Sequence, residues 1–319
     1  MDSVEEVTIA SSANKAHSLI NEIAKVFLGK EQVIRHAVLS LISGGHILLE
    51  DVPGLGKTLL AKAIARAISA EFKRIQFTAD LLPSDISGVT VYSQDSGQFS
   101  FRKGPVFTNI LLGDEINRAT PRTQSSLLEA MEEKSVTVDG QIHKLEEPFF
   151  VLATQNPVEL EGTYPLPFAQ MDRFITRLSI GYLDRADEIR VLMDQRKGHP
   201  LESIQQVMSC HELCTLQEAV RSIRVEEVLC GYIIDIVSAT RGDDALEFGA
   251  SPRGSLDLQR FSQATALIEG RDYVLPDDIK AAAVLVLPHR LIARKGTRSV
   301  SLNTTEVIDH IIDSVPVPV

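Results

Sequence analysis

Five short apolar segments recur in the first half of the chain, each bounded by turn-forming or charged residues. They are His46–Glu50, Arg74–Thr78, Asn109–Glu115, Phe149–Asn156 and Phe174–Ile180. Most of them are apolar at nearly every position, whereas a strand with one face in water alternates apolar and polar residues. The pattern therefore predicts a parallel five-stranded sheet that is covered on both faces.

Helical spacing marks the segments between these strands. After Lys57, apolar residues fall on one helical stripe, at Leu60, Ala63, Ile64, Ala67 and Ile68. Thr120 precedes Pro121, an arrangement typical of a helix N-cap followed by a first-turn proline. Strands that alternate with helices predict an α/β fold of the doubly wound type.

Two further segments have the alternation of β-hairpins and are not needed to complete the sheet. Gly88–Phe101 alternates around Asp95-Ser96-Gly97, and Ser135–Leu145 alternates around Asp139-Gly140, a strong signal for a two-residue turn. We interpret both as insertions into the α/β domain.

From about Asp184 the strand pattern ends and helical segments follow. Ser209 and Glu212 have the spacing of a capping box, and Pro276-Asp277-Asp278 has the composition of a helix start. The sequence therefore predicts two domains. Residues 1–182 form an α/β domain with a short N-terminal helical segment, and residues 183–319 form a small all-helical domain.

The composition of the chain indicates which partners and which cellular compartment to expect. The 319 residues carry a net charge of −11 and only 5% aromatic residues, with no Trp, which argues against a broad duplex-binding face or a base-stacking platform. The acidic N-terminus does not resemble a signal peptide. The longest apolar run, Ala281–Leu287, is far shorter than the roughly 20 residues of a membrane span. Three cysteines fit a reducing compartment, so we expect a soluble cytoplasmic protein.

The stretch EDVPGLGKTLLAKAIARAI, Glu50–Ile68, has the features of a phosphate-binding loop. A strand leads into a glycine-containing turn, Lys57 supplies a cation for the phosphates, Thr58 supplies a hydroxyl for Mg²⁺, and a helix begins there. The expected loop residues are Pro53, Gly54, Leu55, Gly56, Lys57, Thr58 and Leu59. Asp51 stands where the usual pattern has its first glycine, and this substitution is expected to affect nucleotide affinity.

The ends of other strands carry candidates for the remaining chemistry. Asp114 is expected to hold Mg²⁺, and Glu115 to activate the attacking water, a pair that favours ATP hydrolysis. Asn156 follows a buried strand and could hold that water, although alone it reads as a turn residue before a proline. Arg173 and Arg253 are candidates for stabilising phosphoryl transfer, although alone each reads as a surface or ion-pair arginine.

Together these motifs resemble the MoxR family of AAA+ ATPases. The stretches that carry the resemblance are VFLGKEQVI, GGHILLEDVPGLGKTLLAKAIA, QFTADLLPSDISG, LLGDEINRATPRTQSSLLEAMEE, FFVLATQNP, YPLPFAQMDRF and GASPRGSLDLQR. They cover about Ile20–Leu291 in the family's order. The stretches DEINRA and QNP with DRF are specific to this group rather than general signals of phosphate loops.

The resemblance implies an ATP- and Mg²⁺-dependent core with a helical lid, assembled in rings that are usually hexamers. It implies that Asn156 is the sensor-1 residue, Arg173 the arginine finger that reaches a neighbour's ATP, and Arg253 the sensor-2 arginine of the lid. Gly29 lies where the family holds adenine. The hairpins match the helix-2-insert clade, which includes the magnesium-chelatase motor subunit, where they face the pore or the client.

The family's proteins are thought to act as chaperone-like motors in the maturation of protein complexes and in metal-cofactor insertion, often with a partner that has a von Willebrand factor A domain. Two alternatives remain open. One is a nucleic-acid motor of the same clade, against which the acidity counts. The other is a nucleotide-dependent binding switch with little turnover, which would need neither Glu115 nor Arg173.

Overall fold

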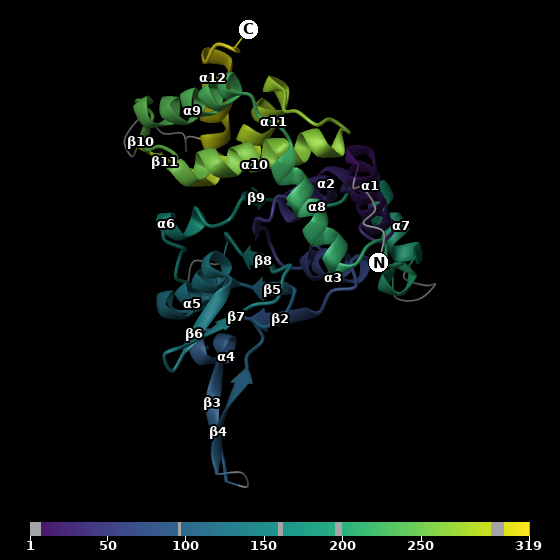
Figure 1. Cartoon of the computed structure of the whole chain (residues 1–319), viewed down its shortest axis with the longest axis vertical. Coiled ribbons are helices and arrows are strands. Elements are labelled where there is room, and N and C mark those ends of the chain that lie inside the picture. The colour runs from purple at the N-terminus through teal and green to yellow at the C-terminus, as the bar shows by residue number, and fades with distance from the viewer. Residues whose placement is uncertain (1–7, 95–96, 159–161, 195–199, 295–302, 319) are drawn as a thin grey trace, which may run out of the picture.

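The computed structural model describes residues 8–94, 97–158, 162–194, 200–294 and 303–318. At its centre is a five-stranded sheet with the order β2-β5-β8-β1-β9, in which every neighbouring pair is parallel (Figure 1). The strands are β1 (Ile47–Glu50), β2 (Phe72–Gln76), β5 (Ile110–Asp114), β8 (Phe150–Gln155) and β9 (Thr176–Leu178). The predicted parallel five-stranded sheet is confirmed.

Each face of this sheet packs against its own apolar cluster. One cluster joins Ile47, Leu49 and Leu112 to helices α1 (Ile9–Ala24), α2 (Glu31–Ile42) and α3 (Lys57–Ala67). The other joins Leu48 and Leu111 to helices α4 (Pro83–Ser87) and α5 (Pro121–Glu133). Successive residues of a strand point to opposite faces, so continuously apolar strands supply both clusters.

The second half of the chain is helical, as expected, with one addition. Its helices of ten residues or more are α7 (Arg185–Asp194), α8 (Cys210–Ser222), α9 (Glu227–Gly242), α10 (Pro252–Ile268), α11 (Pro276–Val286) and α12 (Thr304–Ser314). Ser209 and Glu212 form the predicted capping box. The addition is an antiparallel pair, β10 (Leu246–Phe248) with β11 (Ile292–Ala293), whose strands are too short to show alternation in the sequence. No helix in the described part of the chain has the length and hydropathy that a membrane crossing needs.

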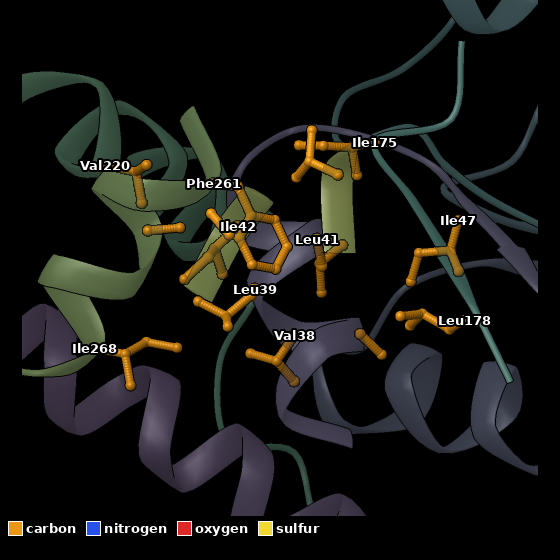
Figure 2. Packing of buried hydrophobic residues seen from close by; sticks show 14 of the residues in the cluster. Val38, Leu39, Leu41, Ile42, Ile47, Ile175, Leu178, Val220, Phe261 and Ile268 are labelled. Atoms are coloured by element: carbon orange, nitrogen blue, oxygen red, sulfur yellow. The ribbon is translucent and has the colours of Figure 1, made fainter. Parts of the chain in front are cut away.

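Helix α2 joins the sheet to the helical half. Figure 2 shows its residues Val38, Leu39, Leu41 and Ile42 among side chains from both sides of it. Ile47 and Leu178 come from the sheet, while Val220 and Phe261 come from α8 and α10. One continuous core therefore runs through the N-terminal helical segment, and the division into residues 1–182 and 183–319 stays a prediction.

Both predicted hairpins are present. One consists of β3 (Gly88–Ser93) and β4 (Gln98–Lys103), and the other of β6 (Ser135–Val138) and β7 (Gln141–Lys144). Of the first predicted turn, Asp95 and Ser96 lie outside the described residues. The β3–β4 hairpin projects far from the rest of the molecule (Figure 1) and exposes 74% of Phe99.

His46, directly before β1, connects three elements of the α/β half. Its Nδ1 accepts a hydrogen bond from the Val151 backbone N–H at 3.1 Å, and its Nε2 donates to the Met131 carbonyl at 3.2 Å. Burial lowers the pKa of His46 to about 4, and the Met131 hydrogen bond opposes part of that shift. The imidazole is therefore neutral at pH 7.

Acidification is expected to destabilise the protein through His46. The imidazole of the unfolded chain, with a pKa of 6.5, takes up a proton that the folded state resists down to a pKa of about 4. The stability is thus present above pH 6.5 and is lost as the pH falls, by about 2 kcal/mol at pH 5. Urea unfolding of the wild type and of His46→Gln at pH 7.5 and pH 5 measures this loss. The free energy of unfolding of the wild type should exceed that of the variant by less at pH 5, and the decrease should equal that amount. A difference that does not change with pH would contradict the lowered pKa of His46.

Candidate functional site

The loop between β1 and α3 has a shape that fits a phosphate group. Gly54 and Gly56 have φ angles of 90° and 87°, which residues with side chains rarely adopt. A Cβ at Gly56 would also lie 3.0 Å from the Phe27 ring. Helix α3 begins at Lys57, so the unpaired N–H groups and the positive dipole end of its first turn face the loop. Backbone donors and Lys57 together can hold an anion there.

Lys57 lies among acidic groups at the same edge of the sheet. Its ammonium donates a hydrogen bond to the Asp51 carbonyl across the loop. Burial lowers the pKa of Lys57 below its ordinary value. The negative charges of Asp51, Asp114 and Glu115 oppose that shift of the Lys57 pKa. Thr58 follows on the first turn of α3, where its hydroxyl is available to a metal ion bound beside the phosphates.

Asp114 and Glu115 are fixed by Thr154 on the neighbouring strand β8. The Thr154 hydroxyl donates to Asp114 Oδ1 at 2.6 Å and accepts from the Glu115 backbone N–H at 2.8 Å. Glu115 has a left-handed φ of 56°, which turns its carboxylate away from the strand direction. Thr154 was not among the predicted site residues, although a hydroxyl inside the apolar segment Phe149–Asn156 was an available signal. In the structure Thr154 is 1% exposed.

Strand β2 contributes two more side chains that were not predicted. Gln76 donates to Glu115 Oε2 at 2.9 Å, and Arg74 donates to Asp114 Oδ2. Carboxylates and a hydroxyl are the oxygen ligands that Mg²⁺ prefers, so Asp114 and Thr58 fit a magnesium ion, provided that Arg74 moves aside. Arg74 is half-exposed, and its guanidinium also donates to Gln76 Oε1 at 2.8 Å.

Asn156 follows β8, between Glu115 at the end of β5 and the phosphate loop at the end of β1. Its Oδ1 accepts a hydrogen bond from the Val158 backbone at 3.1 Å, and its carbonyl accepts one from Asn117 at 3.4 Å. Its amide Nδ2 has no partner among the described residues and can donate to a water or a phosphate oxygen.

An apolar cavity of about 420 Å³ adjoins the phosphate loop, a size that suits a nucleotide base and sugar. Its lining includes Leu28, Ile180, Tyr182 and Leu192, none of which was a predicted site residue. Gly29 lines a shallower hollow next to it, where a Cβ would lie 2.0 Å from Asp187 Oδ2 on α7. The role of Gly29 in holding adenine stays a prediction.

Asp51, which stands in place of the usual first glycine, points away from the loop. It is 7% exposed and accepts hydrogen bonds from Ser179 Oγ at 2.8 Å and from the backbone N–H groups of Ile180 and Gly181 at 2.5 and 3.3 Å. The carboxylate therefore ties the start of the phosphate loop to the segment after β9, which lines the apolar cavity.

Asp51→Asn is expected to lower the free energy of unfolding by about 2–3 kcal/mol, because an amide replaces a buried carboxylate that accepts hydrogen bonds. Nucleotide affinity should also fall, since Ile180 and Gly181 line the cavity. Urea unfolding and equilibrium nucleotide binding measure the two effects. Glu50→Gln is the matched control, since it removes an adjacent, more exposed carboxylate. Equal effects from both variants would contradict a special role for the hydrogen bonds that the buried Asp51 carboxylate accepts.

Arg173 and Arg253 lie together, but at the opposite edge of the sheet. Arg173 precedes β9, at the amino ends of the strands, and the four residues of β1 span about 13 Å from there to the phosphate loop. Both arginines pair with Glu132, at 2.9 Å for Arg173 and 3.1 Å for Arg253. The chain thus presents two cations to the outside, away from its own phosphate loop.

Comparisons with known proteins identify the family of this chain. The profile of the family described as "ATPase family associated with various cellular activities (AAA)" matches residues 46–176, and that described as "AAA lid domain" matches residues 238–311. The chain is 47% identical to the uncharacterized protein YeaC of Bacillus subtilis, with 94% of each covered. It is 38% identical to Chaperone MoxR1 of Mycobacterium tuberculosis, covering 97% of this chain and 84% of that one. A solved structure from Cytophaga hutchinsonii, described as a candidate ATPase, has a TM-score of 0.90 at 39% identity, with 97% of each chain covered.

Proposed function

This chain belongs to the MoxR family of AAA+ ATPases, and we propose that it hydrolyses ATP to remodel a protein client. The observation that carries the proposal is the division of charged groups between the two edges of the sheet. Lys57, Asp114 and Glu115 converge at the carboxyl edge, while two arginines lie at the amino edge. A complete hydrolytic site then forms only between two subunits.

At the carboxyl edge of the sheet, each group of residues has its own role in ATP hydrolysis. The loop from Pro53 to Leu59 and the ammonium of Lys57 bind the phosphates. Thr58 and Asp114 would hold Mg²⁺, which when bound would neutralise negative charge on the phosphates. Glu115 orients the attacking water and accepts its proton, and Asn156 donates its free amide to that water or to the γ-phosphate.

At the amino edge, Arg173 and Arg253 serve the ATP of the neighbouring subunit. Their distance from the loop of their own chain supports an action in trans. A guanidinium brought to the γ-phosphate stabilises the charge of the transition state. Glu132, which pairs with both arginines, keeps them neutralised until a phosphate competes for them.

The ring is proposed to be a hexamer in the cytoplasm, with a partner bearing a von Willebrand factor A domain. Its task is chaperone-like maturation or cofactor insertion. The β3–β4 hairpin is a candidate contact for the client, since Val91, Tyr92 and Phe99 are exposed on it. This apolar surface suits a protein better than a nucleic acid, which would call for a basic one.

The test is ATP hydrolysis with Mg²⁺, measured against protein concentration and alongside sedimentation. The rate per subunit should rise as rings assemble, because each site needs a neighbour's arginines. A low rate that does not change with concentration would contradict the motor and favour a binding switch. Stimulation by DNA that weakens steeply with salt would instead favour a nucleic-acid motor.

A further inference from the structure

A fully buried arginine contacts the segments that carry Arg173 and Arg253, whose own side chains are partly exposed. Arg290, in the short turn Pro288–Arg290 after α11, has a side chain that is 0% exposed. Its Nε donates to Asp172 Oδ1 at 2.8 Å, and one terminal nitrogen donates to Asp257 Oδ2 at 2.6 Å. The other terminal nitrogen donates to the Val286 carbonyl at 2.9 Å, and the carbonyls of Asp172 and Phe174 lie 3.1 and 2.8 Å from the nitrogen that donates to Asp257. The guanidinium thus joins three segments of the chain at one point.

Two of those segments lead directly to Arg173 and Arg253, because residues 172–174 contain Arg173 and helix α10, which holds Asp257, also carries Arg253. Asp172 immediately precedes Arg173 in the chain. Its second carboxylate oxygen accepts from the Ser251 hydroxyl at 2.7 Å. Ser251 is the N-cap of α10 and accepts a hydrogen bond from the backbone N–H of Arg253 at 3.1 Å. A single carboxylate therefore fixes the backbone next to Arg173 and the helix start that carries Arg253.

A gain in folding stability does not by itself explain the buried cluster of Arg290, Asp172 and Asp257. Removing a guanidinium and two carboxylates from water costs about as much as their attraction returns, so buried ion pairs are weak evidence for stability. Their directional hydrogen bonds do specify one arrangement of the groups that they join. Here the specified arrangement sets the separation and direction of two arginines that come from different halves of the chain.

We propose that Arg290, with Asp172 and Asp257, is a positioning unit that holds Arg173 and Arg253 as one rigid pair for the ATP of the neighbouring subunit. The proposal rests on the proposed function, because it needs hydrolysis at sites shared between subunits. The positioning proposal goes beyond the proposed function, because it gives Arg290, Asp172 and Asp257 an effect on a phosphate group that they do not contact.

Asp172→Asn tests the proposal, because it removes one charge and keeps the side-chain volume. The kcat should fall by about 100-fold, the effect of a misplacement of roughly 1 Å. The Kd for ATP should stay within a few-fold of wild type, because the binding loop lies at the other edge. Asp278→Asn is the matched control. It breaks the Arg271–Asp278 ion pair of the same helical half, at 2.7 Å, which contacts neither Arg173 nor Arg253.

Mixing distinguishes positioning from a merely structural role. Lys57→Ala subunits cannot hold the phosphates but keep their arginine pair. Mixed with Asp172→Asn subunits, they should restore hydrolysis well above the sum of the two separate variants. Ser251→Ala, which removes one hydrogen bond to Asp172, should lower kcat by a smaller factor, and Ser251→Thr, which keeps the hydroxyl, should not lower it. If urea unfolding shows that Asp172→Asn does not fold, the two Ser251 variants test the proposal in its place.

The outcomes separate the two proposals. An active wild type whose mixtures are not restored would overturn the positioning unit alone, as would an equal loss of kcat in Asp278→Asn. A loss that appears in the Kd for ATP rather than in kcat would overturn it too. A wild type that is inactive at every concentration would overturn the proposed function and this inference with it.

Discussion

Replacing Arg173 with alanine is expected to lower the rate of ATP hydrolysis by about 10³–10⁵-fold, the contribution of such an arginine in related NTPases. The reason is electrostatic, because Arg173 is proposed to neutralise charge that develops on a neighbour's γ-phosphate. Binding of ATP should persist, since Arg173 lies across the sheet from the phosphate loop. Steady-state hydrolysis and equilibrium binding of a fluorescent ATP analogue measure the two effects.

Arg35→Ala is the matched control for this substitution. The Arg35 side chain is 27% exposed, close to the 28% of Arg173, and it also forms an ion pair, at 2.6 Å to Glu269. It lies in the contact between α2 and the helical half, so its loss should leave hydrolysis nearly unchanged. If Arg173→Ala hydrolyses ATP at a near wild-type rate, the assignment is wrong. If it no longer sediments as a ring, its loss of rate reports assembly instead of chemistry.

Much of the fold could be predicted because its signals are local. Short apolar segments, most of them continuously apolar, marked all five strands, and turn residues such as Asp139-Gly140 marked the hairpins. The phosphate loop was equally visible, because a strand, two glycines, Lys57 and a helix follow one another without a gap. In these cases neighbours in the sequence are also neighbours in the structure.

The partners of the candidate site could not be predicted, because they come from distant segments. Gln76 and Arg290 are ordinary residues in their own surroundings and acquire a role only through strand order or packing. The Thr154 hydroxyl stands out in its apolar segment, but its partners at the end of β5 follow only from the strand order. Asp51 shows the same limit in another way. Its position in the motif was clear, but not that its carboxylate turns toward Ile180.

Glu115→Gln is expected to lower the rate of hydrolysis by about 10²–10⁴-fold, the usual contribution of a general base. The amide has nearly the same shape but cannot accept the proton of the attacking water. Its oxygen can still accept the hydrogen bond that Gln76 donates at 2.9 Å, so the surroundings should stay in place. ATP should therefore bind and remain unhydrolysed, which single-turnover hydrolysis and nucleotide retention measure.

Glu71→Gln is the control, because Glu71 lies just before β2 and pairs only at the surface, at 3.0 Å with Lys73. A rate for Glu115→Gln within a few-fold of wild type would exclude Glu115 as the base.

Mixing the Glu115→Gln and Arg173→Ala variants tests both predictions together, because a shared site takes Glu115 from one subunit and Arg173 from the next. Glu115→Gln and Arg173→Ala, each inactive alone, should regain hydrolysis together, since some interfaces then hold both intact residues. Two variants that stay inactive when mixed, despite forming joint rings, would place the two residues in one site of the same subunit.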